Sequence, residues 1–452
     1  MTKQSHTPGA GRWTAGTLTY TSAGIGILFF WLLWGDFAWS MKDRAVTSVA
    51  TLMVKSFGVS DFMFGLLILS FPNFTNAVLG PLVSYFSDRH RGRFGRRIPF
   101  LAFTVPFIVT GMLGLAFTPL LGEMLHNAAE ADTLSRHTAS LIVFGVFWIM
   151  FDFGNTLASS IFTALVNDVV PTSLLGRFFG LFRGISLAAG VIFNYFLLGR
   201  AESHSMWIFL GLALLYAFGF TLLLFKVKEG EYPPPPPVKP GLKAMVAGYF
   251  RDCFSVPFFS ILFVGLAFNY VSTVCRNMFN LLFALNDLGL TTAQFGRVGA
   301  VGGIVGVALY LPMGYLVDRF HPLRIYLAGA LLVIFVNPFG FFFVHGYGTF
   351  MAMGILLAVV YTVQNSSLLP LCVKLYPKEQ FGQFCSAAAM VKALLLVAAN
   401  AAGGWFIDLF GYRWLYVWDF LFTIPCFVLL LWIYFRWKKL GGDEGYQPPL
   451  RP

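Results

Sequence analysis

Long apolar runs alternate with short polar connections along the whole chain. A helix needs about 20 apolar residues to cross the hydrocarbon core of a membrane, and each run reaches that length. The sequence contains twelve of them, at residues 22–42, 62–86, 98–120, 139–166, 177–199, 206–226, 256–283, 293–316, 323–344, 349–373, 385–407 and 415–436. The pattern predicts an all-α membrane protein with twelve transmembrane helices.

The composition agrees with a membrane protein and excludes a soluble one of this length. Apolar residues make up 57% of the 452, and charged residues make up 11%, compared with roughly a quarter in a soluble domain. The first apolar run has no small-residue cleavage site after it, so we interpret it as a retained helix and not as a signal peptide.

The basic residues predict the orientation. With the N-terminus inside, most of the 31 Lys and Arg residues fall in cytoplasmic segments, as the positive-inside rule requires. We therefore expect both termini in the cytoplasm and the protein in the plasma membrane or a bacterial inner membrane. The net charge of +11 is then a topology signal, and nucleic-acid binding is not expected because no soluble domain presents a basic cluster.

One segment, residues 226–254, has the composition of a linker. It contains the run Pro233 to Pro237, which favours an extended polyproline conformation that separates two blocks. The predicted organisation is an N-terminal six-helix bundle at 1–225, a cytoplasmic linker at 226–254 and a C-terminal six-helix bundle at 255–452.

The two halves contain similar short motifs in the same order. The pairs are VSDFMFG at 59–65 with LTTAQFG at 290–296, SYFSDR at 84–89 with GYLVDR at 314–319, and PTSLLGRF at 171–178 with PKEQFGQF at 377–384. Three pairs at matched positions indicate an internal duplication. Such repeats predict two pseudo-symmetric bundles around a central cavity, as in secondary transporters.

The loop between the second and third runs resembles the G-x-L-x-D-R-x-G-R-[RK] motif of the major facilitator superfamily. Ser84 stands where the family prefers glycine. The resemblance implies the major facilitator fold and a conformational latch of cationic side chains beside an aspartate, made by Asp88, Arg89, Arg93, Arg96, Arg97, Asp168, Asp318 and Arg319. The alternative is that these arginines only obey the positive-inside rule.

Two stretches of the first half show a closer resemblance. Residues 80–100 and 148–168 are similar to sucrose transporters and related glycoside–cation symporters, the second through W-x-x-x-D-x-x-N followed by A-L-x-x-D. Thr163 replaces the arginine of the sucrose carriers, which puts sucrose itself in doubt. The resemblance implies a transporter and not an enzyme, with a sugar or glycoside and a proton as partners.

Ionisable residues inside the apolar runs are candidate functional residues whatever the family. A charge at mid-bilayer costs at least about 2.5–3.5 kcal/mol, so it faces a cavity or a partner. We expect Asp152 above all to carry the coupling proton, since burial raises the pKa of a carboxyl group. Asp36 is the second candidate for the proton and, because tryptophans flank it, also a candidate for substrate contact. Arg183 and Lys392 are the candidate charge partners, and a purely structural ion pair with one of them is the alternative for Asp152. Arg276 is expected at the outer mouth.

Neutral sugars bind aromatic faces and polar groups that form paired hydrogen bonds. The resemblance places the first, fourth, seventh and tenth helices around the cavity, and these carry candidate sugar ligands: Trp31, Trp34, Trp39, Asn155, Asn269, Tyr270, Gln364 and Asn365. The alternatives are tryptophans at the membrane interface and amides that bind helices together.

No cofactor or metal is expected. The sequence has no phosphate-binding glycine loop, and its five cysteines show no C-x-x-C spacing. Melibiose-type relatives carry two acidic residues four apart in the second span, where this chain has Asn76 and Gly80, so a proton is favoured over sodium. The predicted function is proton-coupled sugar or glycoside uptake by alternating access. Its alternatives are a proton-antiport exporter of drugs or amphipathic metabolites and a non-transporting membrane sensor.

Overall fold

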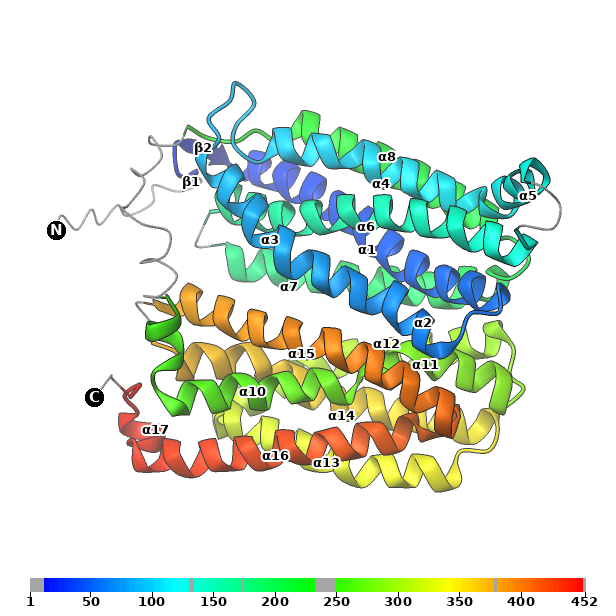
Figure 1. The fold of residues 1–452 in the computed structure, drawn as a ribbon. Helices are drawn as coiled ribbons and strands as arrows, with labels where there is room; N and C mark the ends of the chain where they lie inside the picture. Colours follow the sequence, from blue (N-terminus) through cyan, green and yellow to red (C-terminus); the bar gives the residue numbers. More distant parts are fainter. Residues whose placement is uncertain (1–11, 130–133, 172–173, 232–248, 378–379, 450–452) are drawn as a thin grey trace. The chain divides into compact units, whose positions relative to one another are not determined.

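A computed structural model describes residues 12–129, 134–171, 174–231, 249–377 and 380–449 (Figure 1). The chain forms two compact units. Unit 1 comprises Met1–Gly58, Val78–Phe193 and Arg200–Pro237, and unit 2 comprises Val59–Ala77, Asn194–Gly199 and Val238–Pro452. The proline run at 233–237 lies outside the described residues.

Unit 1 is a helical bundle with a small hairpin at its start. Its described elements are β1 (Arg12–Ala15), β2 (Leu18–Thr21), α1 (Ser22–Ser56), the later part of α3 (Phe71–Arg89), α4 (Ile98–Ala116), α5 (Thr118–Ala128), α6 (Arg136–Val169), α7 (Leu175–Ile192) and α8 (Ser205–Lys226). Within it α4 packs against α6 and α8, and α1 packs against α7 and α8. The antiparallel hairpin and α5 were not predicted, because both are too short to give an apolar run.

Unit 2 is also helical. Its described elements are α2 (Asp61–Gly65), a π-helical turn (Leu66–Ser70), the start of α3, short turns at Phe193–Leu197 and Leu198–Arg200, α10 (Pro257–Ser272), α11 (Val274–Leu282), a π-helical turn (Phe283–Asp287), α12 (Thr292–Phe320), α13 (Pro322–Phe343), α14 (Tyr347–Leu375), α15 (Phe381–Phe410), a turn (Tyr412–Trp414), α16 (Leu415–Lys439) and α17 (Gly442–Gly445). Here α10 packs against α15 and α16, and α14 packs against α12 and α13.

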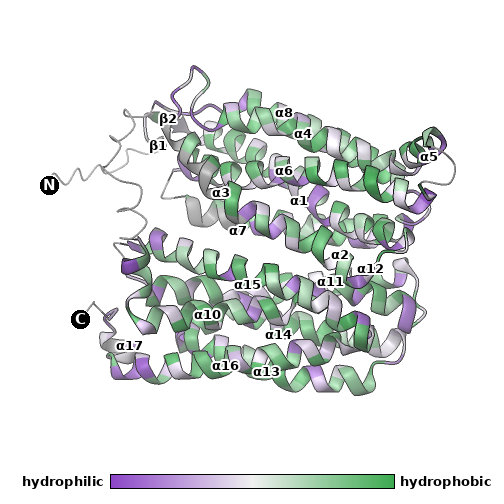
Figure 2. Cartoon of the chain, viewed as in Figure 1, coloured by the Kyte–Doolittle hydropathy of each residue, from purple (hydrophilic) through white to green (hydrophobic). Residues whose placement is uncertain are grey.

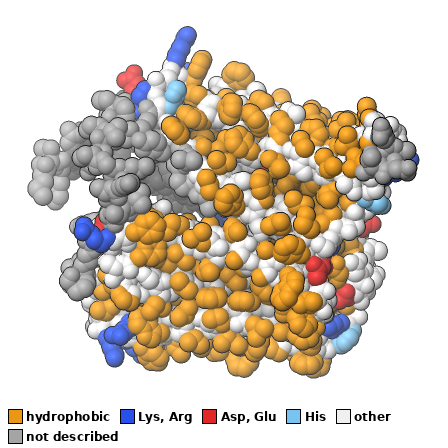
Figure 3. Space-filling view, viewed as in Figure 1, with side chains coloured by type: hydrophobic (Ala, Val, Ile, Leu, Met, Phe, Trp, Pro, Cys, Tyr) orange, Lys and Arg blue, Asp and Glu red, His pale blue; other side chains and the backbone are white. Residues whose placement is uncertain are grey.

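The helices are long and apolar enough to cross a membrane, as predicted. Eleven candidate spans occur in the described part of the chain, and one of them, Leu181–Lys226, is 46 residues long because it contains parts of both α7 and α8. Hydrophobic residues recur along the helices in Figure 2, and in Figure 3 hydrophobic side chains cover most of the visible described face, with the charged ones toward its two sides. The predicted all-helical membrane fold is confirmed.

One of the repeated motifs has a clear structural cause. The Ser60 hydroxyl accepts a hydrogen bond from the Met63 N–H at the start of α2, at 3.3 Å. At the matched place in the second half, Thr291 accepts from the Gln294 N–H at 3.2 Å and begins α12 with a capping box. Both motifs are therefore helix starts, whose orphan N–H groups need such a partner.

A carboxylate of α15 binds the start of α2 within unit 2. The Asp408 side chain accepts hydrogen bonds from the N–H groups of Asp61 at 2.9 Å and Phe62 at 2.8 Å. Gly404, one helical turn earlier, has its Cα against the Asp61 carbonyl, where a Cβ would collide. A negative charge at a helix N-terminus also interacts favourably with the helix dipole, so this contact fixes α2 on α15.

His321 connects α12 to α13 in a strained conformation, with φ at 71°. The buried imidazole lies 4.4 Å from the Trp437 ring centroid and accepts a hydrogen bond from the Leu323 N–H at 3.3 Å. Burial and the nearby Lys374 ammonium lower the pKa of His321 to about 4, from an ordinary value of roughly 6.5.

This depressed pKa predicts a pH-dependent stability. The stabilisation from neutral His321 is complete above about pH 6.5 and is lost as the pH falls toward 4, because the unfolded chain then binds the proton more tightly. We expect the Tm of the purified protein to fall between pH 7.5 and pH 5. In His321→Asn, whose amide can still accept the hydrogen bond, the fall should be smaller, and an equal fall in both proteins would contradict the assignment.

Candidate functional site

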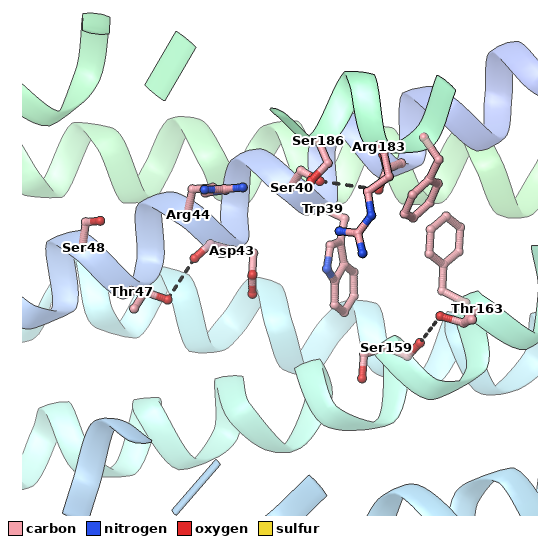
Figure 4. Close-up of a pocket in the computed structure, with 13 residues that line it drawn as sticks. Trp39, Ser40, Asp43, Arg44, Thr47, Ser48, Ser159, Thr163, Arg183 and Ser186 are labelled. Atoms are coloured by element: carbon pink, nitrogen blue, oxygen red, sulfur yellow. Dashed lines mark hydrogen bonds between the residues drawn. The ribbon is translucent and has the colours of Figure 1, made fainter. Parts of the chain in front are cut away.

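Unit 1 contains a cavity of about 580 Å³ between α1, α6 and α7 (Figure 4). Its lining consists of six hydroxyl side chains, four charged side chains and three aromatic ones, which are Ser40, Thr47, Ser48, Ser159, Thr163 and Ser186, then Asp36, Asp43, Arg44 and Arg183, then Trp39, Phe162 and Phe182. Hydroxyl groups beside aromatic faces suit a ligand that has both polar edges and apolar faces.

Asp36 is the buried acid of this cavity. Its side chain is only 1% exposed, although it lines the cavity from α1. One carboxylate oxygen accepts a hydrogen bond from Ser40, one turn along the helix, at 3.4 Å. The other oxygen is buried and has no hydrogen-bond partner among the described residues. Figure 4 shows the Arg183 side chain extending from α7 toward Trp39, and Arg183 acts electrostatically on Asp36. The structure thus places Asp36 and Arg183 in the same cavity.

Asp152 lies elsewhere in unit 1. It is buried on α6 with 3% exposure and is absent from the cavity lining. Its neighbourhood contains a lysine that the sequence analysis overlooked. Lys42 of α1 is fully buried, and its ammonium donates a hydrogen bond to the Asn155 side-chain carbonyl, one turn from Asp152. Lys42 is the last residue of the first predicted apolar run, 22–42, and it was not counted among the ionisable residues inside the runs.

Three of the candidate sugar ligands of unit 1 do not line the cavity, and the fourth, Trp39, does. Trp31 makes an edge-to-face contact with Phe30 at 5.1 Å. Trp34 stacks on Phe37 at 6.1 Å, and its indole N–H is buried without a hydrogen-bond partner among the described residues. Asn155 is engaged by the buried lysine. Trp39, which the first helix also carries, is the tryptophan that reaches the cavity.

The other candidate ligands belong to unit 2. Asn269 and Gln364 are buried, and the Gln364 amide nitrogen has no hydrogen-bond partner in the part of the chain that the structure describes. The Lys392 ammonium lies 4.7 Å from the Tyr270 ring centroid, which is a cation–π contact. Asn365 is exposed. The structure therefore brings Lys392 and Tyr270 together.

Unit 2 also contains a buried ion pair that the sequence analysis did not predict. The Arg276 guanidinium donates to the Asp419 carboxylate at 2.9 and 3.0 Å, and the Tyr361 hydroxyl donates to the same carboxylate at 2.6 Å. Arg276 also donates to Asn337. Both charged side chains are buried, with 8% and 0% exposure. Arg276, which we expected at the outer mouth, is thus buried inside unit 2, where Asp419 of α16 compensates its charge.

The basic loop forms a charged cluster within unit 1. Arg96 binds Asp168 through two hydrogen bonds, of 3.0 and 2.6 Å, and Arg97 donates to the same carboxylate at 3.0 Å. A second nitrogen of Arg97 donates to the Ser87 hydroxyl at 2.7 Å. Asp168 therefore ties the end of α6 to the loop before α4. Charge-assisted pairs of this geometry are the stronger kind.

Glu229, just after α8, is a member of this cluster that the sequence analysis missed. Its carboxylate accepts hydrogen bonds from three consecutive N–H groups, those of Arg96 at 2.9 Å, Arg97 at 2.7 Å and Ile98 at 2.7 Å. These groups open α4 and have no partner within the helix. Three N–H donors and the dipole of α4 explain why an acidic residue is held here.

The other five candidate latch residues are described only in part. The side chains of Asp88, Arg89 and Asp318 lie outside the described ones. Arg93 and Arg319 are exposed, and the Arg319 guanidinium lies 5.4 Å from the ring centroid of the adjacent phenylalanine.

The sequence of this chain matches a known family over most of its length. The sequence model of the Major Facilitator Superfamily matches residues 28–285 and 262–445, which together span most of the 452 residues. The chain belongs to the major facilitator superfamily. It is accordingly an integral, multi-pass membrane protein with the fold of a secondary transporter.

Solved structures show the same fold at low sequence identity. A bacterial homologue of the human lysosomal transporter Spinster, inward-facing and occupied, is 15% identical with a TM-score of 0.67, over 93% of this chain and 99% of that chain. A D-xylose–proton symporter is 15% identical with a TM-score of 0.64, over 91% and 97%. A nucleoside transporter is 9% identical with a TM-score of 0.65, over 90% and 100%. These similarities show the fold. They do not identify a substrate, because the three proteins are named as different transporters.

The cluster around Asp168 predicts a kinetic effect in this transporter. Asp168→Asn removes one partner of two arginines without touching the cavity, so we expect slower turnover and a nearly unchanged Kd for substrate. Glu123→Gln is a suitable control, because Glu123 makes only a surface pair with Arg136 at 3.5 Å, and such pairs contribute little. Transport rate and binding should be measured on the same purified proteins. Equal losses in Kd and turnover would argue against a latch.

Proposed function

We propose that this transporter takes up a sugar or glycoside together with a proton by alternating access. The observation that supports this most is the buried oxygen of Asp36, which has no hydrogen-bond partner among the described residues, at a cavity lined by hydroxyl and aromatic side chains. A proton on that oxygen neutralises the carboxylate where water is largely excluded, and it supplies a donor toward a ligand in the cavity.

Three features favour a sugar or glycoside as the substrate. The six hydroxyl groups can exchange hydrogen bonds with a polyol, and the rings of Trp39, Phe162 and Phe182 offer apolar faces. Residues 80–100 and 148–168 resemble sugar–proton symporters. One protein with the same fold is a D-xylose–proton symporter.

The proposed topology places both termini in the cytoplasm, with the Arg96 and Arg97 cluster on the cytoplasmic side. This follows from the distribution of lysine and arginine along the sequence. The N-terminal and C-terminal bundles would then rock about a site at mid-membrane, in the manner of transporters built from repeats. Either the plasma membrane or a bacterial inner membrane fits this topology.

Uptake into proteoliposomes under separately imposed gradients tests the proposal. Labelled sucrose, D-xylose and a methyl glucoside would be offered with a pH gradient alone and with a sodium gradient alone. We expect at least one of them to accumulate under the pH gradient, and sodium to have no effect. Stimulation by sodium at equal pH would refute proton coupling. Expulsion of an amphipathic dye with proton entry would favour the exporter, and no flux of any of these compounds would favour the sensor.

A further inference from the structure

Lys42 is enclosed by aromatic rings in the interior of unit 1. Its ammonium lies 3.7 Å from the Trp39 ring centroid, 5.2 Å from that of Phe151 and 5.6 Å from that of Tyr216. The side chain is fully buried. Cation–π contacts compensate part of the lost hydration, but a buried ammonium also needs a counter-charge nearby.

The partners of Lys42 lie on α6. The Asn155 side-chain carbonyl accepts its hydrogen bond, and Asp152 is three residues earlier, on the same face of that helix. Two carboxylates act electrostatically on the Lys42 ammonium, Asp43 on α1 itself the more strongly and Asp152 on α6 the less. Asp43 is exposed, so water screens it, whereas Asp152 is buried with Lys42.

In the described middle parts of the helices that pack here, the other charged or titratable groups face the cavity or belong to the cage. They are Asp36, Asp43 and Arg44 on α1, Arg183 on α7 and Tyr216 on α8. The remaining ones lie toward the helix ends, namely Lys55, Arg136, His137, Asp168 and Lys226. Asp152 is thus the buried acid near Lys42, and Asp36 is the buried acid that lines the cavity.

We propose that Lys42 is the built-in counter-cation of Asp152, so that Asp152 stays ionised throughout the cycle and Asp36 carries the coupling proton. The part about the proton rests on the proposed function, and the charge pair does not. This assignment differs from the expectation from the sequence, which favoured Asp152 as the proton carrier. It also assigns Asn155 to positioning Lys42, and not to contact with the substrate.

A double-mutant cycle on thermal unfolding tests the pair without any substrate. Lys42→Met and Asp152→Asn should each lower the Tm of the purified protein, because each leaves one charge buried alone. The double variant Lys42→Met/Asp152→Asn removes both charges and should recover much of the loss, with a Tm above that of at least one single variant. Additive losses in the double variant would overturn the pair.

Transport by the same variants tests the division of roles. With labelled sugar that the wild type accumulates, each single variant should lose accumulation by about tenfold or more, since one unpaired buried charge obstructs the cycle, and the double variant should return to within about threefold of wild type. The pH profile of accumulation by the double variant should match that of the wild type. If the double variant folds and binds sugar but cannot accumulate it, Asp152 carries the proton and the proposal is wrong.

The two tests also separate this inference from the proposed function. A wild type that accumulates no sugar under a pH gradient refutes the proposed function and, with it, the proton role of Asp36. In that case the double-mutant cycle on thermal unfolding still decides whether Lys42 and Asp152 are paired. Recovery of Tm in the double variant indicates a pair, and additive losses of Tm indicate none.

Discussion

Asp36→Asn is expected to abolish sugar accumulation against a gradient and to leave downhill exchange of sugar intact. The substituted amide has nearly the same shape and can keep the hydrogen bond from Ser40, which is 3.4 Å long in the structure. It cannot take up or release a proton, so the cycle loses its link to the pH gradient. Exchange needs no proton release, because the loaded carrier returns still loaded.

Two measurements on the same vesicles check this prediction. Accumulation of labelled sugar is followed under a pH gradient, and counterflow of sugar is followed at equal pH. Glu123→Gln makes the same chemical change at an exposed position on α5 and should behave like wild type in both. Undiminished accumulation by Asp36→Asn would remove Asp36 from the proton pathway.

Asp419→Asn is expected to produce the largest loss of stability in unit 2. The substitution leaves the Arg276 guanidinium buried with no compensating charge, and breaking a buried pair in this way costs about 3–5 kcal/mol. The Tyr361 hydroxyl also loses its charged acceptor, to which it now donates at 2.6 Å. We therefore expect a much lower Tm and a smaller monodisperse fraction after purification.

An exposed ion pair in the same unit provides the control. Arg324 and Asp443 are 2.6 Å apart, but their side chains are 40% and 49% exposed, so Asp443→Asn should cost about 1 kcal/mol or less. Removing both buried charges in Arg276→Met/Asp419→Leu should recover much of the stability that Asp419→Asn loses. Similar losses of stability from Asp419→Asn and Asp443→Asn would show that burial does not determine how much the Arg276–Asp419 pair contributes to stability.

The helices could be predicted because their signal is local. An apolar run of about 20 residues can be read within a short window, and the caps at Ser60 and Thr291 lie within three residues of the groups that they bind. The hairpin at the N-terminus and α5 lack such a run, and they were missed for that reason.

The charged contacts inside the units could be predicted only in part. Arg96, Arg97 and Asp168 were all expected in the latch from the family resemblance, although Asp168 lies 71 or more residues from the two arginines in the chain. Glu229 joins Arg96 across 133 residues, and nothing near Glu229 in the sequence marks it as a cap for another helix.

The candidate site shows the same limit. Asp36 and Asp152 were selected as charges in apolar runs, and burial of both agrees with that reasoning. Which of the two acids lines the cavity and which lies near Lys42 depends on the rotation of α1, α6 and α7 about their own axes. A single sequence does not determine that rotation. The candidate sugar ligands Trp31, Trp34 and Asn155 lie on α1 and α6, two helices of the cavity, but none of these three lines it.

The most direct test of proton-coupled transport is the movement of protons when sugar is added. Cells that express the protein are suspended without buffer, and the external pH is recorded after a pulse of a sugar that they take up. The account predicts a transient alkalinisation with wild type and none with Asp36→Asn. Uptake of the sugar by wild type without any change in external pH would contradict it.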